Sequence, residues 1–142
     1  TRRSPTMLEL SQSAQVTAGI VLLAAVTVTS GGAFLAKVAT GGVPATDFQK
    51  SFFRAGHGHA GVLIVFGLVC LLLSEATALT GFAHWLAATG VLVSAIVLPA
   101  GFFFSAMGAE RSRPNRAIVV VWAGGAILVA GLITLAIGLL TA

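Results

Sequence analysis

Two histidines and an arginine lie within six residues of one another in the stretch FFRAGHGHAG, residues 52–61. Imidazole nitrogens can ligate haem iron or a divalent transition metal and can carry protons, and a guanidinium pairs with anionic groups. The chain is only 8% charged and 57% hydrophobic, and this stretch leads directly into the apolar run 62–74. Arg54, His57 and His59 are therefore the first candidates for a ligand or partner site.

The length of the apolar run sets the depth of these side chains. Thirteen residues cover only about 20 Å at 1.5 Å per residue, whereas the hydrocarbon core is about 30 Å thick. We therefore expect a spanning helix to begin near Phe52 or Ala55, with His57 and His59 one to two turns inside and Arg54 snorkelling toward the surface. An ionisable group at such depth indicates function by default. The alternative is that both histidines are neutral interfacial residues and the glycines serve close packing.

The spacing of the two histidines limits what they can bind together. Residues two apart lie about 200° apart around a regular helix, so His57 and His59 should point to opposite faces and cannot share one metal ion. Unwinding at Gly56 and Gly58 would allow both imidazoles to reach one ion, with Glu110 as a third ligand. An axial pair of His57 and Met107 would instead suit a haem. His84 should lie at the opposite membrane surface, which excludes a bis-histidine haem with His57 within one subunit.

Four long apolar segments predict an all-α fold. A spanning helix needs about 20 residues, so four of them use nearly all of the 142 residues and form a single transmembrane domain. We expect an integral membrane four-helix bundle of up-down-up-down topology. The predicted spans are residues 16–36, 53–75, 81–106 and 117–140. Gly124, Gly131 and Gly138 repeat at seven-residue spacing in the last span and predict a close helix contact there.

The basic residues predict the orientation and the partners. Lys37, Lys50, Arg54 and the arginines of ERSRPNR, residues 110–116, fall in the first and third loops, while Arg2 and Arg3 precede the first span. The positive-inside rule then places these two loops in the cytoplasm and both termini outside a cell membrane. The net charge of +4 indicates contact with membrane lipids rather than with nucleic acid, because no Lys/Arg block with interleaved aromatics accompanies it. Glycine-rich faces on the second and fourth spans favour a homo-oligomer or a subunit of a membrane complex.

The stretch RAGHGHAGVL, residues 54–63, resembles a motif of small four-span bacterial integral membrane proteins of unestablished activity, in which Arg, Ala, Gly and a His-x-His pair open the second span. A remoter similarity links the pair to haem- and copper-associated membrane proteins. That second resemblance implies His57 and His59 as ligands. The chain departs from its pattern because no further histidine is expected at the same depth.

These patterns favour a non-enzymatic membrane component with a polar site at Arg54, His57, His59 and Glu110, for a small ligand, a lipid head group or a partner helix. No nucleophile, Walker or dinucleotide motif stands in a suitable context. The alternatives are a haem- or metal-binding redox protein and a proton or ion conductor. The sequence does not select a particular cofactor.

Overall fold

The computed structural model describes residues 9–142 as four helices in the order α1 (Gln12–Ala39), α2 (Asp47–Ser74), α3 (Gly81–Ala106) and α4 (Ile118–Leu140). Each helix is long and apolar enough to cross a membrane. The predicted all-α four-helix bundle is confirmed, and the four spans support a multi-pass membrane protein. Arg2 and Arg3, which bear on the predicted orientation, lie outside the described residues.

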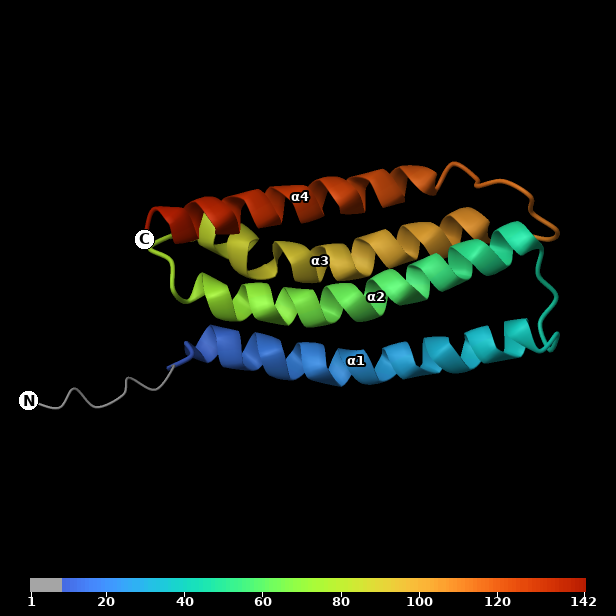
Figure 1. Cartoon of the computed structure of the whole chain (residues 1–142), viewed down its shortest axis with the longest axis horizontal. Helices are drawn as coiled ribbons and strands as arrows, with labels where there is room; N and C mark the ends of the chain where they lie inside the picture. Colours follow the sequence, from blue (N-terminus) through green and yellow to red (C-terminus); the bar gives the residue numbers. More distant parts are fainter. Residues whose placement is uncertain (1–8) are drawn as a thin grey trace, which may run out of the picture.

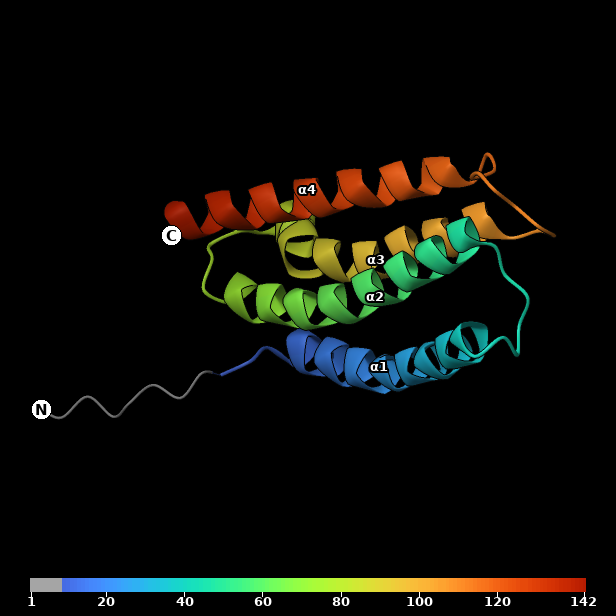
Figure 2. The ribbon, with the colours of Figure 1, turned by 45° about the vertical axis from the view of Figure 1, so that its right-hand side comes forward.

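The helices lie side by side in chain order and alternate in direction (Figures 1 and 2). The backbone of α3 approaches both α2 and α4 closely, and α2 also meets α4. The backbone of α1 approaches closely only the backbone of α2. Accordingly, 56% of the most apolar 18-residue window of α3 is made up of buried residues, whereas the corresponding share in α1 is 0%. The bundle is thus a compact group of three helices with α1 added on the outer side of α2.

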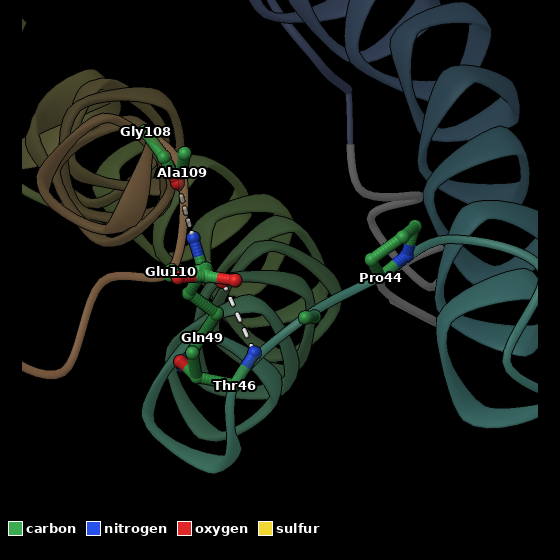
Figure 3. Close-up of a pocket in the computed structure, with 7 residues that line it drawn as sticks. Pro44, Thr46, Gln49, Gly108, Ala109 and Glu110 are labelled. Atoms are coloured by element: carbon green, nitrogen blue, oxygen red, sulfur yellow. Dashed lines mark hydrogen bonds between the residues drawn. The ribbon is translucent and has the colours of Figure 1, made fainter.

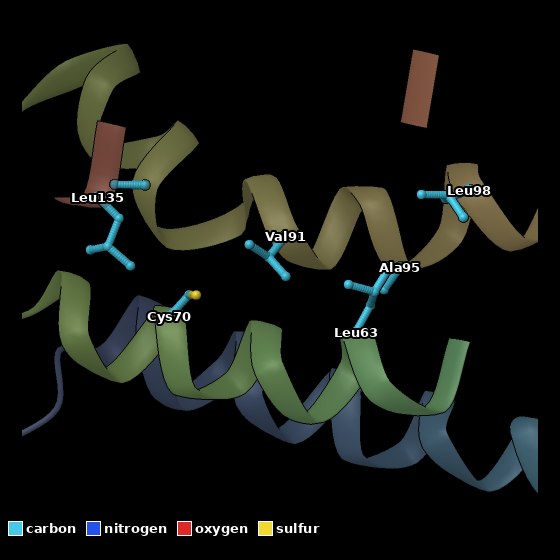
Figure 4. Close-up of a cluster of buried hydrophobic side chains, with 7 residues drawn as sticks. Leu63, Cys70, Val91, Ala95, Leu98 and Leu135 are labelled. Atoms are coloured by element: carbon cyan, nitrogen blue, oxygen red, sulfur yellow. The ribbon is translucent and has the colours of Figure 1, made fainter. Parts of the chain in front are cut away.

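The main core lies where α2, α3 and α4 meet. Figure 4 shows Leu63 and Cys70 of α2 facing Val91, Ala95 and Leu98 of α3, with Leu135 of α4 closing the cluster. A second cluster joins the start of α1 to α2 and α3 at one end of the bundle; its buried members are Ala14, Leu71, Ala88 and Leu92.

Glycines allow α3 and α4 to pack backbone against backbone. A Cβ placed on Gly124 would lie 2.8 Å from Leu98 Cα, and one placed on Gly131 would lie 3.2 Å from Gly90 Cα. Gly138 packs instead against the side chain of Leu79, in the turn before α3. The close contact predicted from the seven-residue glycine spacing is therefore present within the chain. These three glycines are buried on α3 and its preceding turn, so they offer no face for self-association.

The start of α2 differs from the sequence-based expectation. The helix begins at Asp47 rather than near Phe52 or Ala55, because Thr46 forms a capping box with Gln49: Gln49 N donates to Thr46 Oγ1 at 3.2 Å, and Thr46 N donates to Gln49 Oε1 at 3.1 Å. The T-x-x-Q pattern in the sequence carries this signal. Helical structure therefore extends beyond the apolar run toward the first loop.

Candidate functional site

The helix α2 is regular through the two histidines, so the unwinding that would bring both rings to one ion is not present. His57 is half-buried and faces α1. Its ring lies against the paired glycines of that helix: a Cβ on Gly31 would be 3.0 Å from His57 Nδ1, and a Cβ on Gly32 would be 3.6 Å from Nε2. Any larger side chain at Gly31 would displace the imidazole. The ring makes no hydrogen bond to another described residue, 9–142.

His59 points away from α1 and is exposed. Its Nδ1 lies 2.7 Å from the Ala55 carbonyl oxygen, and its ring stacks on Phe102 with centroids 5.1 Å apart. A carbonyl can only accept, so Nδ1 is the donor in this contact. The two histidines therefore lie on different faces of α2, as the helical spacing predicted.

The other predicted site residues lie in or beside the loop between α3 and α4. Met107 caps the end of α3 with an exposed side chain. Glu110 has a positive φ of 47° and lines a surface cavity of about 360 Å³ together with Thr46, Gln49 and neighbouring loop residues (Figure 3). Within residues 9–142 no three His, Cys, Asp or Glu side chains form a group that could hold a metal ion. Ligation of a metal by His57 and His59, or of a haem by His57 and Met107, stays a prediction.

Gln49 links this loop to the N-terminal end of α2 through hydrogen bonds. It is buried, and its Nε2 donates to the carbonyls of Ala106, at 3.0 Å, and Gly108, at 2.7 Å. Thr46 Oγ1 also donates to the Arg111 carbonyl. One amide side chain thus satisfies two carbonyls at the C-terminal end of α3, where intrahelical partners are lacking. The sequence patterns did not reveal this role of Gln49.

An apolar groove of about 310 Å³ runs between α1 and α3, with α2 as its floor. We call it the α1–α3 groove. Ala60 and Ile64 of α2 form the floor, and the walls are Thr17, Ile20, Val21, Ala24, Thr27 and Val28 of α1 and Thr89, Leu92, Val93, Ala95 and Ile96 of α3. Thr27 and Thr89 donate their hydroxyls to carbonyls of their own helices, at 2.6 and 2.7 Å. These two hydroxyls are therefore already satisfied.

Side-chain clusters bound the groove along the helix axes. One cluster lies about two helical turns from Ala60, toward the start of α2. There the ring of Phe53 lies 5.5 Å from that of Phe34 of α1 and 5.6 Å from that of Phe103 of α3, measured between centroids. The cluster of Ala14, Leu71, Ala88 and Leu92 bounds the other end. Phe53, Ala60 and Ile64 share one stripe of α2, and His57 lies beside that stripe, one turn from Ala60. No sequence pattern signalled this groove, because it depends on the separation of α1 from α3.

Arg54 does not line the groove, and its side-chain hydrogen bond goes to neither histidine ring. It is exposed and donates Nε to the Lys50 carbonyl at 3.3 Å. Arg54 and Lys50 line a separate cavity of about 250 Å³. Its other lining residues are Leu35, Val38 and Ala39, near the end of α1. The predicted set Arg54, His57, His59 and Glu110 is therefore distributed over several distinct surfaces.

Comparison of the chain with protein-family models, with curated proteins and with solved structures found no match.

Proposed function

We propose that the protein is a non-enzymatic integral membrane component that binds a small amphiphilic ligand in the α1–α3 groove, with the polar part of the ligand at His57. The observation that carries the proposal is the position of a half-buried imidazole, without a hydrogen bond to another described residue, one turn above the groove floor at Ala60. This is a lipid or small-ligand function of the kind that the histidine motif favoured.

The shape and chemistry of the groove support an aliphatic occupant. Ligand sites commonly measure about 300–1,000 Å³ and are lined mostly by apolar side chains with few polar groups. At about 310 Å³ the groove lies at the lower end of that range. The hydroxyls of Thr27 and Thr89 are engaged and Thr17 supplies one further wall hydroxyl, so the groove offers a ligand mainly apolar contacts.

His57 supports a polar group at one end of that ligand. A neutral imidazole offers one donor and one acceptor, and leaving such atoms unpaired in an apolar environment costs free energy. A ligand carbonyl or hydroxyl beside the ring would satisfy one of them. The contact of the ring with Gly31 and Gly32 holds it between α1 and α2 at the level expected for such a group.

The first test compares ligands that co-purify with three forms of the full chain, extracted gently from membranes and identified by mass spectrometry. Ala60→Phe fills the groove floor, and Ala126→Phe adds the same bulk on the exposed face of α4. We expect Ala60→Phe to lower the occupancy of the co-purified ligand at least about tenfold and Ala126→Phe to leave it unchanged. Equal occupancy in Ala60→Phe and wild type, with both chains folded, would reject the groove as the site.

A second comparison tests the polar contact. His57→Phe keeps an aromatic ring on the α1 glycines but removes both nitrogens. We expect it to weaken retention of a ligand with a polar head while sparing purely aliphatic species. An unchanged ligand profile would assign His57 to packing alone.

Self-association stays part of the proposal as a homo-oligomer or a subunit of a membrane complex. Gly124, Gly131 and Gly138 of α4 do not support it, since they pack on α3 and its preceding turn, but Gly58 of α2 has no atom within 4 Å of the position that an added Cβ would take and remains open to a partner helix. The oligomeric mass in nanodiscs decides this point. An absorption spectrum with metal analysis of gently purified protein tests the haem and metal alternatives, and no specific contact among residues 9–142 favours them or proton conduction.

A further inference from the structure

The cavity that contains Lys50 and Arg54 combines two positive charges with an apolar wall. Its other lining residues are Leu35, Val38 and Ala39 of α1. Lys50 and Arg54 are one turn apart on α2, so their side chains are neighbours of like charge. Asp47, one turn earlier, lines no part of the cavity. Among residues 9–142 the lining of the cavity therefore includes no carboxylate that would offset the repulsion between the two cations.

We propose that this cavity binds the head group of an anionic phospholipid, with the phosphate between Lys50 and Arg54. A guanidinium binds phosphate oxygens in a bidentate manner, and an ammonium contributes a compact charge from a flexible stem. Arg54 uses its Nε on the Lys50 carbonyl at 3.3 Å, and its two terminal nitrogens remain available. Leu35, Val38 and Ala39 provide the apolar wall that a lipid requires and a free phosphate does not.

The open backbone of α2 below Arg54 offers a path for the acyl chain. Gly61 lies two turns below Arg54 on the same stripe, and it has no neighbour within 4 Å of the position of an added Cβ. A hydrocarbon chain can therefore lie directly against the α2 backbone below the two cations. The head-group cavity therefore lies nearer the membrane surface than the chain path, in the same order as the head group and acyl chain of a membrane lipid.

This site is distinct from the α1–α3 groove. Arg54 and Ala60 are six residues apart, which corresponds to about 120° around α2, so the two features occupy different faces of the helix. The lining residues of the cavity and of the groove do not overlap. The two proposals can therefore fail independently.

The test measures lipid binding to the full chain by native mass spectrometry, with dioleoyl phosphatidylglycerol as the anionic probe and dioleoyl phosphatidylcholine as the zwitterionic probe. We expect the double variant Lys50→Gln/Arg54→Gln to bind phosphatidylglycerol about 30-fold more weakly, at roughly fivefold for each charge near the surface. The matched control Arg113→Gln/Arg116→Gln removes two exposed cations from the loop between α3 and α4 and should leave binding within about twofold.

Three outcomes would overturn the proposal: an equal loss in the two double variants, equal binding of the two lipids by the wild type, or competition by inorganic phosphate at the affinity of the lipid. Gly61→Phe keeps both cations but blocks the chain path, and we expect it to weaken phosphatidylglycerol binding as well. If the Lys50/Arg54 variant does not fold, unchanged binding in Gly61→Phe still refutes the site. Ala60→Phe, which blocks the groove, should bind phosphatidylglycerol as the wild type does.

Discussion

Two adjacent glycines of α4 are expected to respond to alanine in opposite ways. A Cβ on Gly124 would lie 2.8 Å from the N, Cα and Cβ atoms of Leu98, whereas a Cβ on Gly125 has nothing within 4 Å. The three Leu98 atoms belong to the backbone of α3 or are fixed to it, so they cannot move away as the end of a long side chain could. Gly124→Ala therefore requires the two helices to separate, and Gly125→Ala does not.

The magnitude follows from three contributions. Overpacking at a tight contact costs about 1–3 kcal/mol. Separation of the helices also lengthens the buried bond from Ser94 Oγ to the Gly124 carbonyl, now 2.9 Å, and an interhelical bond of this kind contributes roughly 0.6–1.7 kcal/mol in a membrane. Replacing glycine by alanine within a helix returns about 0.8–1 kcal/mol. We expect Gly124→Ala to lower the free energy of unfolding by about 1–3 kcal/mol and Gly125→Ala to raise it by up to about 1 kcal/mol.

The assay is reversible unfolding of the full chain in mixed micelles of detergent and SDS, followed by tryptophan fluorescence. Trp122 lies on α4 and is exposed, so the emission should report the release of this helix. The difference between the two variants, rather than either value alone, tests the contact. Equal changes of the same sign would refute the conclusion that α3 and α4 pack through Gly124. Ser94→Ala should reproduce only the smaller, hydrogen-bond part of the Gly124 effect.

The remaining predictions concern the two ends of the bundle. Gln49→Leu leaves two carbonyls at the end of α3 without their donor, and we expect it to destabilise the fold by about 1–3 kcal/mol. Gln15→Leu, an exposed control with one hydrogen bond to Leu10, should change stability by less than about 0.5 kcal/mol in the same titration; equal effects would show that the Gln49 bonds contribute little. At the other end, Glu75 Oε2 accepts from the Ser11 N–H at 2.7 Å, so Glu75→Ala should speed hydrogen exchange in the first turn of α1. Unchanged exchange there would mean that the apolar cluster alone holds α1.

The contact made by Glu75 is one that the sequence does not reveal. A carboxylate at the end of a span is usually only solvated, but here it binds the backbone at the start of α1. The two residues are 64 positions apart in the chain. No local pattern reports such a contact, because it arises only when the start of the first helix and the end of the second meet at one surface.

Local chemistry in the sequence determined the four apolar helices, their alternation and the divergence of His57 from His59. Helix length follows from the extent of each apolar run, and two residues on one regular helix keep a fixed angle. The glycine spacing of the last span likewise indicated a close helix contact. The T-x-x-Q signal for the earlier start of α2 was present, although it was outweighed by the apolar pattern.

The tertiary structure alone decided which surfaces those residues share. In a membrane the lipid is as apolar as the side chains, so hydrophobic periodicity does not say which face meets another helix and which meets lipid. That is why Gly124 and Gly131 of α4 pack on α3, why His57 rests on Gly31 and Gly32, and why Arg54 and Glu110 lie apart. The α1–α3 groove exists because the backbone of α1 lies close to α2 and farther from α3, and such spacing is a property of the assembled helices rather than of any one segment.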